Sequence, residues 1–317
     1  MQANKYMDFY TPGKLLIAGE YLVLNGATAL AVPTSGYGQK MSVSENNRQQ
    51  ILWKSFDTNG KWFEAIFSTE LKIIESTNKQ TAEILQKLLL FIQQNSKLSF
   101  QDGYIINTEL EFDKNWGFGS SSGLIVNLSK WSGVDMFKLL LNSFGGSGYD
   151  IATAWENKPV LYRLSNKNEE FSYHYNNLFP VWKPIDFKPT FTEKLWLIYL
   201  GHKQNSRKEI KRYQTKIPDE KLIKSISNIS LEISKTNDFQ YFNKLIKQHE
   251  QLLSGYLERP PVKQQLFNDY PGEIKSLGAW GGDFILATGD AAPEYFRKKS
   301  YQIILPFYKI LDKKQTN

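Results

Sequence analysis

Short apolar and aromatic runs dominate the first part of the chain, separated by turn-forming Pro-Gly and Asn-Gly pairs. Such runs predict β-strands, here over residues 6–10, 15–24, 39–44, 50–53, 62–68 and 104–111. Between the last two, apolar side chains recur every three or four positions from Ala82 to Ile92. This spacing predicts a helix over 81–95. A further helical stretch is expected after Ser122.

The pattern changes near residues 179–189, where three prolines fall within eleven positions and predict a linker. Beyond it, the sequence predicts a strand over 194–200 and two helices that begin near Asp219 and Asp238. Strand-like segments follow at 283–288 and 303–305. The order of elements predicts an α+β protein with two domains, 1–185 and 186–317.

Composition agrees with a folded chain of this size. Of 317 residues, 41% are hydrophobic and 22% charged, which excludes a largely disordered protein. No apolar run reaches the roughly 18 residues of a membrane helix, and Lys14 and Glu20 interrupt the apolar stretch that a signal peptide would need. The chain has no cysteine, so a disulfide scaffold, a thiol nucleophile and a Cys-ligated metal are excluded. A soluble cytoplasmic protein without a membrane partner is expected.

The net charge of +7 raises the question of a nucleic-acid partner. Arginine leads in contacts to bases and phosphates, yet only six of the 39 basic residues are arginine and the lysines are scattered. We therefore expect no nucleic-acid partner. An anionic small substrate accounts for the same excess of positive charge.

The segment with the clearest chemistry is residues 115–123, Asn-Trp-Gly-Phe-Gly-Ser-Ser-Ser-Gly, between an expected strand and an expected helix. Two glycines allow a tight turn, and the N–H groups at the start of a helix favour a phosphate. The candidate nucleotide-binding residues are Trp116, Gly117, Phe118, Gly119, Ser120, Ser121 and Ser122. The alternative is a Gly/Ser turn that merely caps a helix, because the segment matches neither the P-loop nor the dinucleotide fingerprint.

Two other glycine-rich segments stand out. Asp150 follows the turn Gly145–Gly148 and could accept a proton or hold a metal. Spacing alone favours the alternative that Asp150 is the N-cap of a helix. Residues 278–283, Gly-Ala-Trp-Gly-Gly-Asp, precede an expected strand and by themselves indicate no more than a hairpin loop.

Three segments of the chain, two of them glycine-rich segments described above, resemble the motifs of the GHMP kinases, the family that includes galactokinase and the homoserine, mevalonate and phosphomevalonate kinases. Residues 11–21, Thr-Pro-Gly-Lys-Leu-Leu-Ile-Ala-Gly-Glu-Tyr, resemble its first motif. Residues 117–121 resemble the second, which contacts nucleotide phosphates, and residues 278–283 resemble the third. The resemblance implies ATP use. It also implies a ribosomal-protein-S5-like N-terminal domain with a left-handed βαβ crossover, and a ferredoxin-like C-terminal domain.

Within the family, residues 12–21 and 148–152 are most similar to the phosphomevalonate and mevalonate kinases. The resemblance implies that the γ-phosphoryl group of Mg·ATP passes to phosphomevalonate or mevalonate, precursors of isoprenoids. Asp150 would take or steer the acceptor proton beside Lys14, and Ser121 would bind magnesium. The other implied substrate contacts are Glu20, Tyr21, Ser147, Gly148, Arg207, Gly281 and Gly282. A homodimer is compatible with this assignment.

The chain departs from the family pattern at several positions. Trp280 stands where the third motif usually has a small residue, and Leu139 occupies the place of a magnesium-binding glutamate of mevalonate kinase. Two alternatives therefore stay open: a GHMP kinase for another small alcohol such as a sugar, and a non-catalytic protein that keeps the fold.

Overall fold

The computed structural model describes residues 6–46, 48–166, 178–201, 213, 216–278 and 280–311. The chain is a mixed α and β protein with two compact units, each assembled from separate stretches of sequence. The first unit comprises residues 1–13, 37–114 and 118–155, and the second comprises 14–36, 115–117 and 156–317. Strands β1 (Tyr6–Ala18) and β2 (Ala29–Glu45) each contribute to both units.

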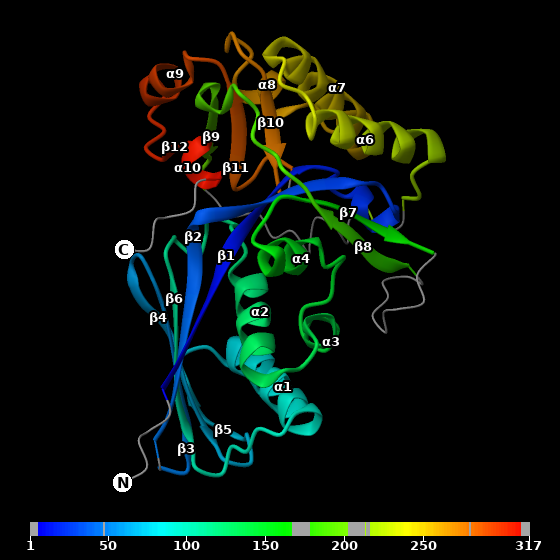
Figure 1. Cartoon of the computed structure of the whole chain (residues 1–317). Helices are drawn as coiled ribbons and strands as arrows, with labels where there is room; N and C mark the ends of the chain where they lie inside the picture. Colours follow the sequence, from blue (N-terminus) through cyan, green and yellow to red (C-terminus); the bar gives the residue numbers. More distant parts are fainter. Residues whose placement is uncertain are drawn as a thin grey trace. The chain divides into compact units, whose positions relative to one another are not determined.

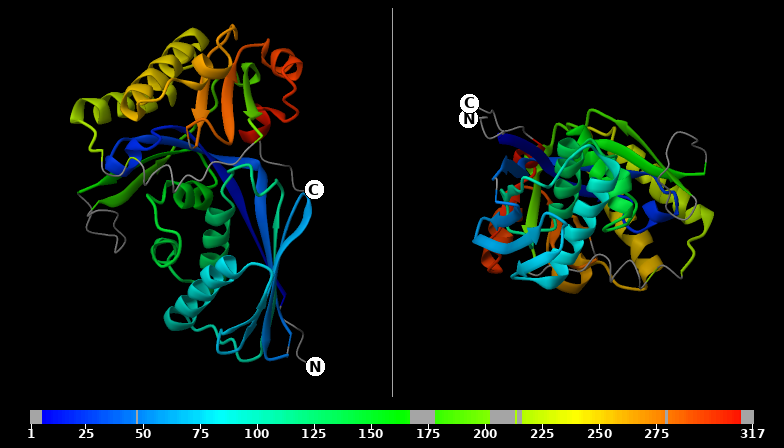
Figure 2. Two further views of the ribbon diagram at one scale, coloured as in Figure 1. Left: turned by 180° about the vertical axis from the view of Figure 1, so that it is seen from behind. Right: turned by 90° about the horizontal axis from the view of Figure 1, so that it is seen from below.

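The first unit is a sheet covered by helices. Its strands follow the order β5-β4-β3-β6-β2, and β3 and β6 run parallel. The further strands are β3 (Gln50–Asp57), β4 (Gly60–Ser68), β5 (Ile73–Ser76) and β6 (Tyr104–Leu110). The helices are α1 (Lys79–Asn95), α2 (Ser120–Ser132), α3 (Met136–Leu141) and α4 (Tyr149–Glu156). Helices α1, α2 and α3 lie on one side of this sheet (Figures 1 and 2), because apolar side chains such as Leu88, Ile92 and Ile125 are fully buried there.

The second unit contains a four-stranded antiparallel sheet in the order β10-β11-β9-β12. Its strands are β9 (Leu195–Tyr199), β10 (Ile274–Leu277), β11 (Phe284–Thr288) and β12 (Ile304–Pro306). Its helices are α6 (Glu220–Ile233), α7 (Phe239–Leu257), α8 (Val262–Leu266), α9 (Ala292–Lys298) and α10 (Tyr308–Leu311). The succession strand, helices, two strands, helix, strand is the ferredoxin-like order expected from the sequence. This unit also contains the 3₁₀ turns Leu22–Asn25 and Thr192–Lys194, and the paired strands β7 (Val160–Ser165) and β8 (Phe179–Pro184).

Three expectations from the pattern need correction. Residues 179–184 form strand β8, which pairs with β7, and are not a linker. Pro12 and Gly13 do not interrupt the first strand, since β1 runs from Tyr6 to Ala18. A proline lacks the N–H for a sheet ladder but is tolerated in a strand with one unpaired edge, and β1 pairs only with β2 among the described strands. Residues 22–25 form a 3₁₀ turn rather than the end of a strand.

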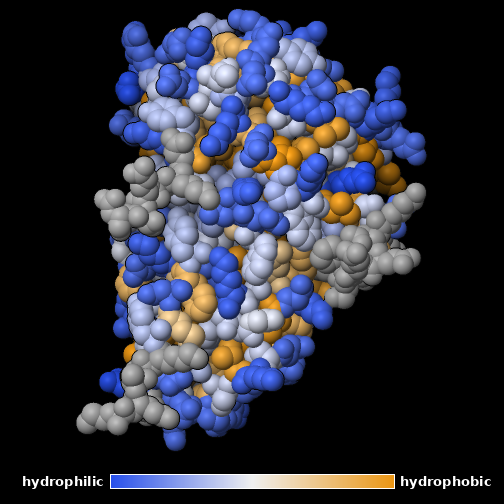
Figure 3. Space-filling view, in the orientation of Figure 1, coloured by the Kyte–Doolittle hydropathy of each residue, from blue (hydrophilic) through white to orange (hydrophobic). Residues whose placement is uncertain are grey.

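The two compact units do not coincide with the expected domains, because residues 14–36 group with the second half of the chain. The division at 185/186 into functional domains stays a prediction. Exposed lysines occur in both units, and hydrophilic residues are frequent on the surface shown in Figure 3. The exposed lysines of α6, α7 and α9 include Lys221, Lys224, Lys244, Lys247 and Lys298. Across the part of the chain that the structure describes, no helix combines the length and the hydropathy of a membrane span.

Candidate functional site

Residues of all three glycine-containing motifs meet at Gly117 in the second unit. Lys14, from β1, donates a hydrogen bond from Nζ to the carbonyl oxygen of Gly117 over 3.3 Å. From the opposite end of the sequence, the carboxylate of Asp283 packs against the Cα of Gly117 so closely that a Cβ there would lie 2.5 Å from Asp283 Oδ2. Gly117 also has a φ of +72°, a conformation that glycine adopts without strain. The second motif therefore requires glycine at this position for two independent reasons.

Asp283 is held firmly at the end of the third motif. It is buried, its φ is +47°, and its carbonyl oxygen accepts the N–H of Leu200 at the end of β9 over 2.8 Å. Gly278 approaches the same carboxylate, since a Cβ there would lie 3.5 Å from Oδ2. Asp283 was absent from the residues predicted for the site. The Gly-Gly-Asp ending of the third motif is the sequence signal that could have found it.

The remainder of the second motif belongs to the first unit and forms the N-terminus of α2. Gly119 precedes the helix with a φ of +95°, as a tight turn into a helix requires. The Ser122 hydroxyl is occupied inside this turn, because it donates to the Gly119 carbonyl over 2.9 Å. Ser120 and Ser121 are half-buried, and in the described part of the chain the Ser121 hydroxyl has no hydrogen-bond partner. The N-terminus of a 13-residue helix with an available hydroxyl suits a phosphate group.

Two aromatic residues of the second motif have structural contacts. Phe118 is completely buried, and its ring lies 5.7 Å from that of Tyr37 and 5.6 Å from that of Phe112. Trp116 is half-buried and packs edge-on against Phe284 at 5.7 Å. Phe118 therefore has only its backbone to offer a nucleotide, whereas part of the Trp116 ring is accessible.

Asp150 lies in the first turn of α4, in the first unit. The helix begins at Tyr149, so Gly148 and not Asp150 precedes it, and the N-cap alternative for Asp150 is wrong. Among the described residues, the half-buried Asp150 carboxylate makes no hydrogen bond or ion pair. Gly148 has a φ of +86°, and a Cβ there would lie 2.7 Å from Phe137 Cε1. The turn before Asp150 is thus fixed by packing, while the carboxylate itself is available for chemistry.

The predicted substrate contacts have different surroundings. Glu20 is buried in the second unit and forms an ion pair with Lys275. Tyr21 is half-buried, and its hydroxyl accepts the backbone N–H of Trp280 over 2.8 Å. Ser147 is buried in the first unit, Gly281 and Gly282 follow Trp280 in the second, and Arg207 lies outside the described residues. Contact of any of these with a substrate stays a prediction, as does the pairing of Lys14 with Asp150, which belong to different units.

A magnesium ion would be held by few protein groups. The described residues contain no group of three or more His, Asp or Glu side chains arranged to bind a metal, and Leu139 is fully buried. Magnesium commonly uses one or two protein oxygens together with substrate phosphates and water. The Ser121 hydroxyl and the Asp150 carboxylate, both without a hydrogen-bond or ion-pair partner among the described residues, fit such a role individually.

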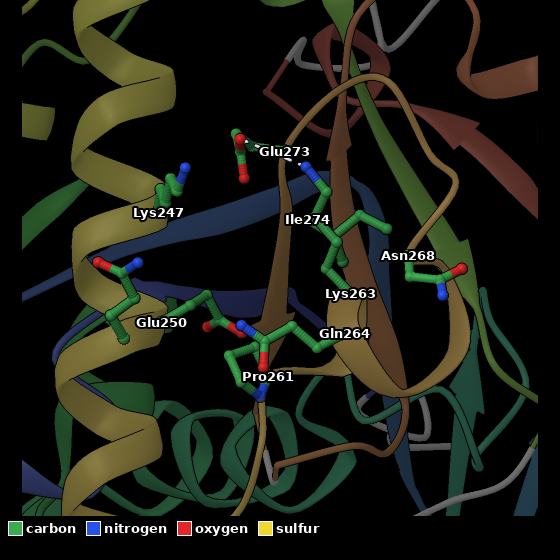
Figure 4. Close-up of a pocket in the computed structure, with 9 residues that line it drawn as sticks. Lys247, Glu250, Pro261, Lys263, Gln264, Asn268, Glu273 and Ile274 are labelled. Atoms are coloured by element: carbon green, nitrogen blue, oxygen red, sulfur yellow. Dashed lines mark ion pairs between the residues drawn. The ribbon is translucent and has the colours of Figure 1, made fainter.

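A separate cavity of about 240 Å³ lies in the second unit, bordered by α7, α8 and β10 (Figure 4). Lys263 and Glu273 form an ion pair on its wall at 3.3 Å. The Glu250 side chain extends from α7 toward Gln264 and Pro261, and its carboxylate is almost entirely buried. None of the three predicted motifs contributes to the lining of this cavity.

The arrangement of strands and helices is the two-domain fold of the GHMP kinases. Mevalonate kinase of Methanococcus jannaschii aligns over 95% of this chain and 97% of its own, with a TM-score of 0.65 and 16% identity. A Streptococcus pneumoniae phosphomevalonate kinase, solved with phosphomevalonate and AMPPNP, aligns over 94% and 99% with a TM-score of 0.66 and 17% identity. Lactococcus lactis galactokinase in complex with galactose aligns over 95% and 92%, with a TM-score of 0.60 and 11% identity.

These similarities are visible in structure and not in sequence comparison. No family model and no curated protein matches the chain. The fold class expected from the three motifs is confirmed, whereas the choice among substrates of these kinases is not decided at such identities.

Proposed function

We propose that this protein is an ATP-dependent small-molecule kinase that transfers the γ-phosphoryl group of ATP to phosphomevalonate or mevalonate. The observation that carries the proposal is the convergence of Lys14 and Asp283 on Gly117, which joins one residue from each of three motifs. The N-terminus of α2, which begins three residues after Gly117, supplies a setting for phosphate groups.

Phosphoryl transfer requires positioning and charge neutralisation more than covalent chemistry, because the transition state is loose. The Lys14 ammonium would contact the transferred phosphoryl oxygens and stabilise the charge that develops on them. Backbone N–H groups of residues 117–121 would bind the other phosphates. Asp150 would accept or steer the proton of an attacking hydroxyl. A magnesium ion, held through Ser121 and the phosphates, would neutralise phosphate charge.

The identity of the acceptor is the finer part of the proposal. An anionic acceptor is supported by the similarity to a phosphomevalonate kinase solved with phosphomevalonate. Arg207, one of the substrate contacts implied by the resemblance, would bind the anionic end. A sugar acceptor is the second candidate, since galactokinase aligns over nearly the whole chain. Asp150 matters less if the acceptor is a phosphate, because a phosphate oxygen needs little deprotonation at neutral pH.

The test is ATP-dependent phosphorylation of mevalonate, phosphomevalonate, homoserine and galactose by the purified protein. With the best acceptor, Lys14→Met is expected to lower kcat about a hundredfold or more with a smaller change in ATP affinity, because its charge acts mainly on the transition state. Asp150→Asn should behave similarly for mevalonate and weakly for phosphomevalonate. Asp135→Asn, which changes an exposed helix N-cap, is the control.

If galactose is the only acceptor that is phosphorylated, the proposal of mevalonate or phosphomevalonate as acceptor is refuted and a sugar is the acceptor instead. Absence of both turnover and calorimetric ATP binding would refute kinase activity. Full activity of Lys14→Met and Asp150→Asn would refute the roles given to these residues.

A further inference from the structure

Four ionisable side chains are buried together in the second unit, and one of them, Glu20, is also a predicted substrate contact. Glu20 follows β1, His249 and Glu250 lie on α7, and Lys275 lies on β10. Each is at most 3% exposed. Burying a charge is costly unless the charge is paired, so the contacts within this group, called the buried cluster below, have to account for its presence.

Lys275 is the centre of the buried cluster. Its Nζ forms an ion pair with Oε1 of Glu20, donates to the Ser276 carbonyl over 2.8 Å, and lies 4.0 Å from Oε1 of Glu250. The Ser276 hydroxyl donates to the other Glu250 oxygen over 3.2 Å. One cation thus faces two carboxyl groups that come from different elements.

The protonation states follow from this count of charges. Burial raises the pKa of Glu250 to about 8, so Glu250 is mostly neutral at pH 7 and the single positive charge of Lys275 is left to Glu20. Burial, reinforced by the charge of Lys275, lowers the pKa of His249, which is therefore neutral as well. Burial also raises the pKa of Glu20, while Lys275 lowers it, and His249 Nε2 lies 3.3 Å from Oε2 of Glu20. Lys275 therefore pairs most closely with Glu20, beside a neutral His249.

His249 and Lys275 both bind the turn that ends the first motif. The N–H of Gly19 donates to Nε2 of His249 over 3.2 Å, and Gly19 has a φ of +98°. A Cβ on Gly19 would lie 2.7 Å from the Cα of Ala29, so the turn is also confined sterically. Glu20 is the next residue. Two consecutive residues are therefore bound by side chains that lie 230 and 255 positions away.

The same contacts connect the first motif to the third. Lys275 and Ser276 lie on the strand that leads into the loop 278–283, and the hydroxyl of Tyr21 accepts the N–H of Trp280 in that loop. Lys14 precedes the turn on β1, and Asp283 ends the loop. The two residues that meet at Gly117 are thus connected by a second bridge, through the buried cluster.

We infer that His249 and Lys275 are positioning residues for phosphoryl transfer: by binding the turn at 19–20, they set where Lys14 lies relative to Gly117 and Asp283. The inference rests on the proposed kinase function. Neither residue belongs to a predicted motif, and each acts through hydrogen bonds and an ion pair rather than by touching a substrate. Apolar residues of similar size often give equal or greater stability than a buried ion pair, so the contribution of the pair is geometric.

The test is a double-mutant cycle on kcat, measured at a temperature at which every variant is folded. Lys275→Met is expected to lower kcat about a hundredfold in the wild-type background, since a misplacement of about 1 Å can have that effect, and to change KM for ATP much less. In the Lys14→Met background, Lys275→Met should lower kcat less than twofold, because Lys14 is no longer there to be positioned.

Lys263→Met is the matched control. It removes another lysine–glutamate pair in the same unit, at 3.3 Å, without touching the turn, and should leave kcat unchanged in both backgrounds. Equal losses from Lys275→Met with and without Lys14 would overturn the inference. So would a change confined to thermal stability.

A second readout does not depend on activity. Hydrogen exchange of the backbone amides of residues 16–23 and 276–283 should become at least tenfold faster in Lys275→Met, and stay as in the wild type in Lys263→Met. If Lys275→Met does not fold, His249→Leu replaces it and should free the Gly19 amide, while His249→Gln, which keeps an acceptor, should restore both exchange protection and kcat. Unchanged exchange overturns the inference. A wild-type protein without turnover refutes only the kinase function, and exchange then decides the positioning role alone.

Discussion

Replacing Glu250 by glutamine is expected to make the protein less sensitive to rising pH. Burial raises the pKa of Glu250 from its ordinary value near 4.5 to about 8, with Lys275 acting in the opposite direction. Between these two values the unfolded chain releases a proton that the folded chain retains. Folding stability therefore falls as pH rises through this interval and levels off above pH 8. Glutamine is similar in shape to the protonated side chain and cannot ionise, so Glu250→Gln removes this loss.

The size of the effect follows from the interval. At about 1.4 kcal/mol for each pH unit, the whole range from pH 4.5 to 8 corresponds to about 5 kcal/mol, and the part between pH 6.5 and 8 to about 2 kcal/mol. The range from pH 6.5 to 8 is the better one for the measurement, because titration of His249 does not change the folding stability there. Burial lowers the pKa of His249, so this residue affects stability only below about pH 6.5. A difference of about 2 kcal/mol corresponds to roughly 4 °C in Tm for a chain of this size.

The assay is thermal unfolding of wild type and Glu250→Gln in steps from pH 6.5 to 8.5. We expect Tm of the wild type to fall by roughly 4 °C more than that of the variant. Glu273→Gln, which changes another carboxyl group on the wall of the same cavity, should keep the wild-type slope. Parallel pH curves for wild type and Glu250→Gln would refute the assignment of a protonated Glu250, and with it the charge count of the buried cluster.

Two further predictions concern the motifs. Gly117→Ala should abolish most phosphoryl transfer in the kinase assay, because the new Cβ would lie 2.5 Å from Asp283 Oδ2 and φ is +72°. Gly145→Ala is the control for backbone strain, since φ there is +64° but nothing lies within 4 Å of the new Cβ. This control should retain most of the activity. Trp280→Ala should destabilise the protein by about 3–5 kcal/mol, measured by denaturant unfolding, since it empties a fully packed site; a loss under about 1 kcal/mol would contradict the packing role.

Local sequence patterns were sufficient to predict the helices that begin at a recognisable N-cap residue. Asp219 and Asp238 were expected to start helices, and their carboxylates accept backbone N–H groups of Leu222 and Tyr241 at the first turns of α6 and α7. The linker expected over the proline-rich segment 179–189 was wrong for residues 179–184, which form strand β8. Pairing with β7 determines this strand, and a local sequence pattern does not identify the pairing partner. In the candidate site, the motifs were evident in sequence, but their meeting at Gly117 depends on long-range contacts.

The buried cluster shows the same limit more sharply. Lys275 stands in the strand sequence Ile-Lys-Ser-Leu, where a lysine normally points to solvent, yet it is completely buried. Its partner Glu20 lies 255 residues away, so nothing near either residue identifies the pair. His249, which belongs to none of the motifs, is buried with a definite partner, the N–H of Gly19.

Trp280 bears on the choice between a catalytic and a non-catalytic protein. A tryptophan in the third motif would block a nucleotide or substrate if its ring lay in the open loop. The ring instead packs in the hydrophobic core with Leu22 and Leu253, and its indole N–H donates to the Pro260 carbonyl over 3.2 Å. The departure from the small residue usual there is thus used for packing within the second unit, and the backbone N–H of Trp280 still binds Tyr21 of the first motif. Trp280 is one of the two departures that left the non-catalytic alternative open. Because its ring packs in the core and its backbone N–H binds Tyr21, this departure by itself does not favour a non-catalytic protein.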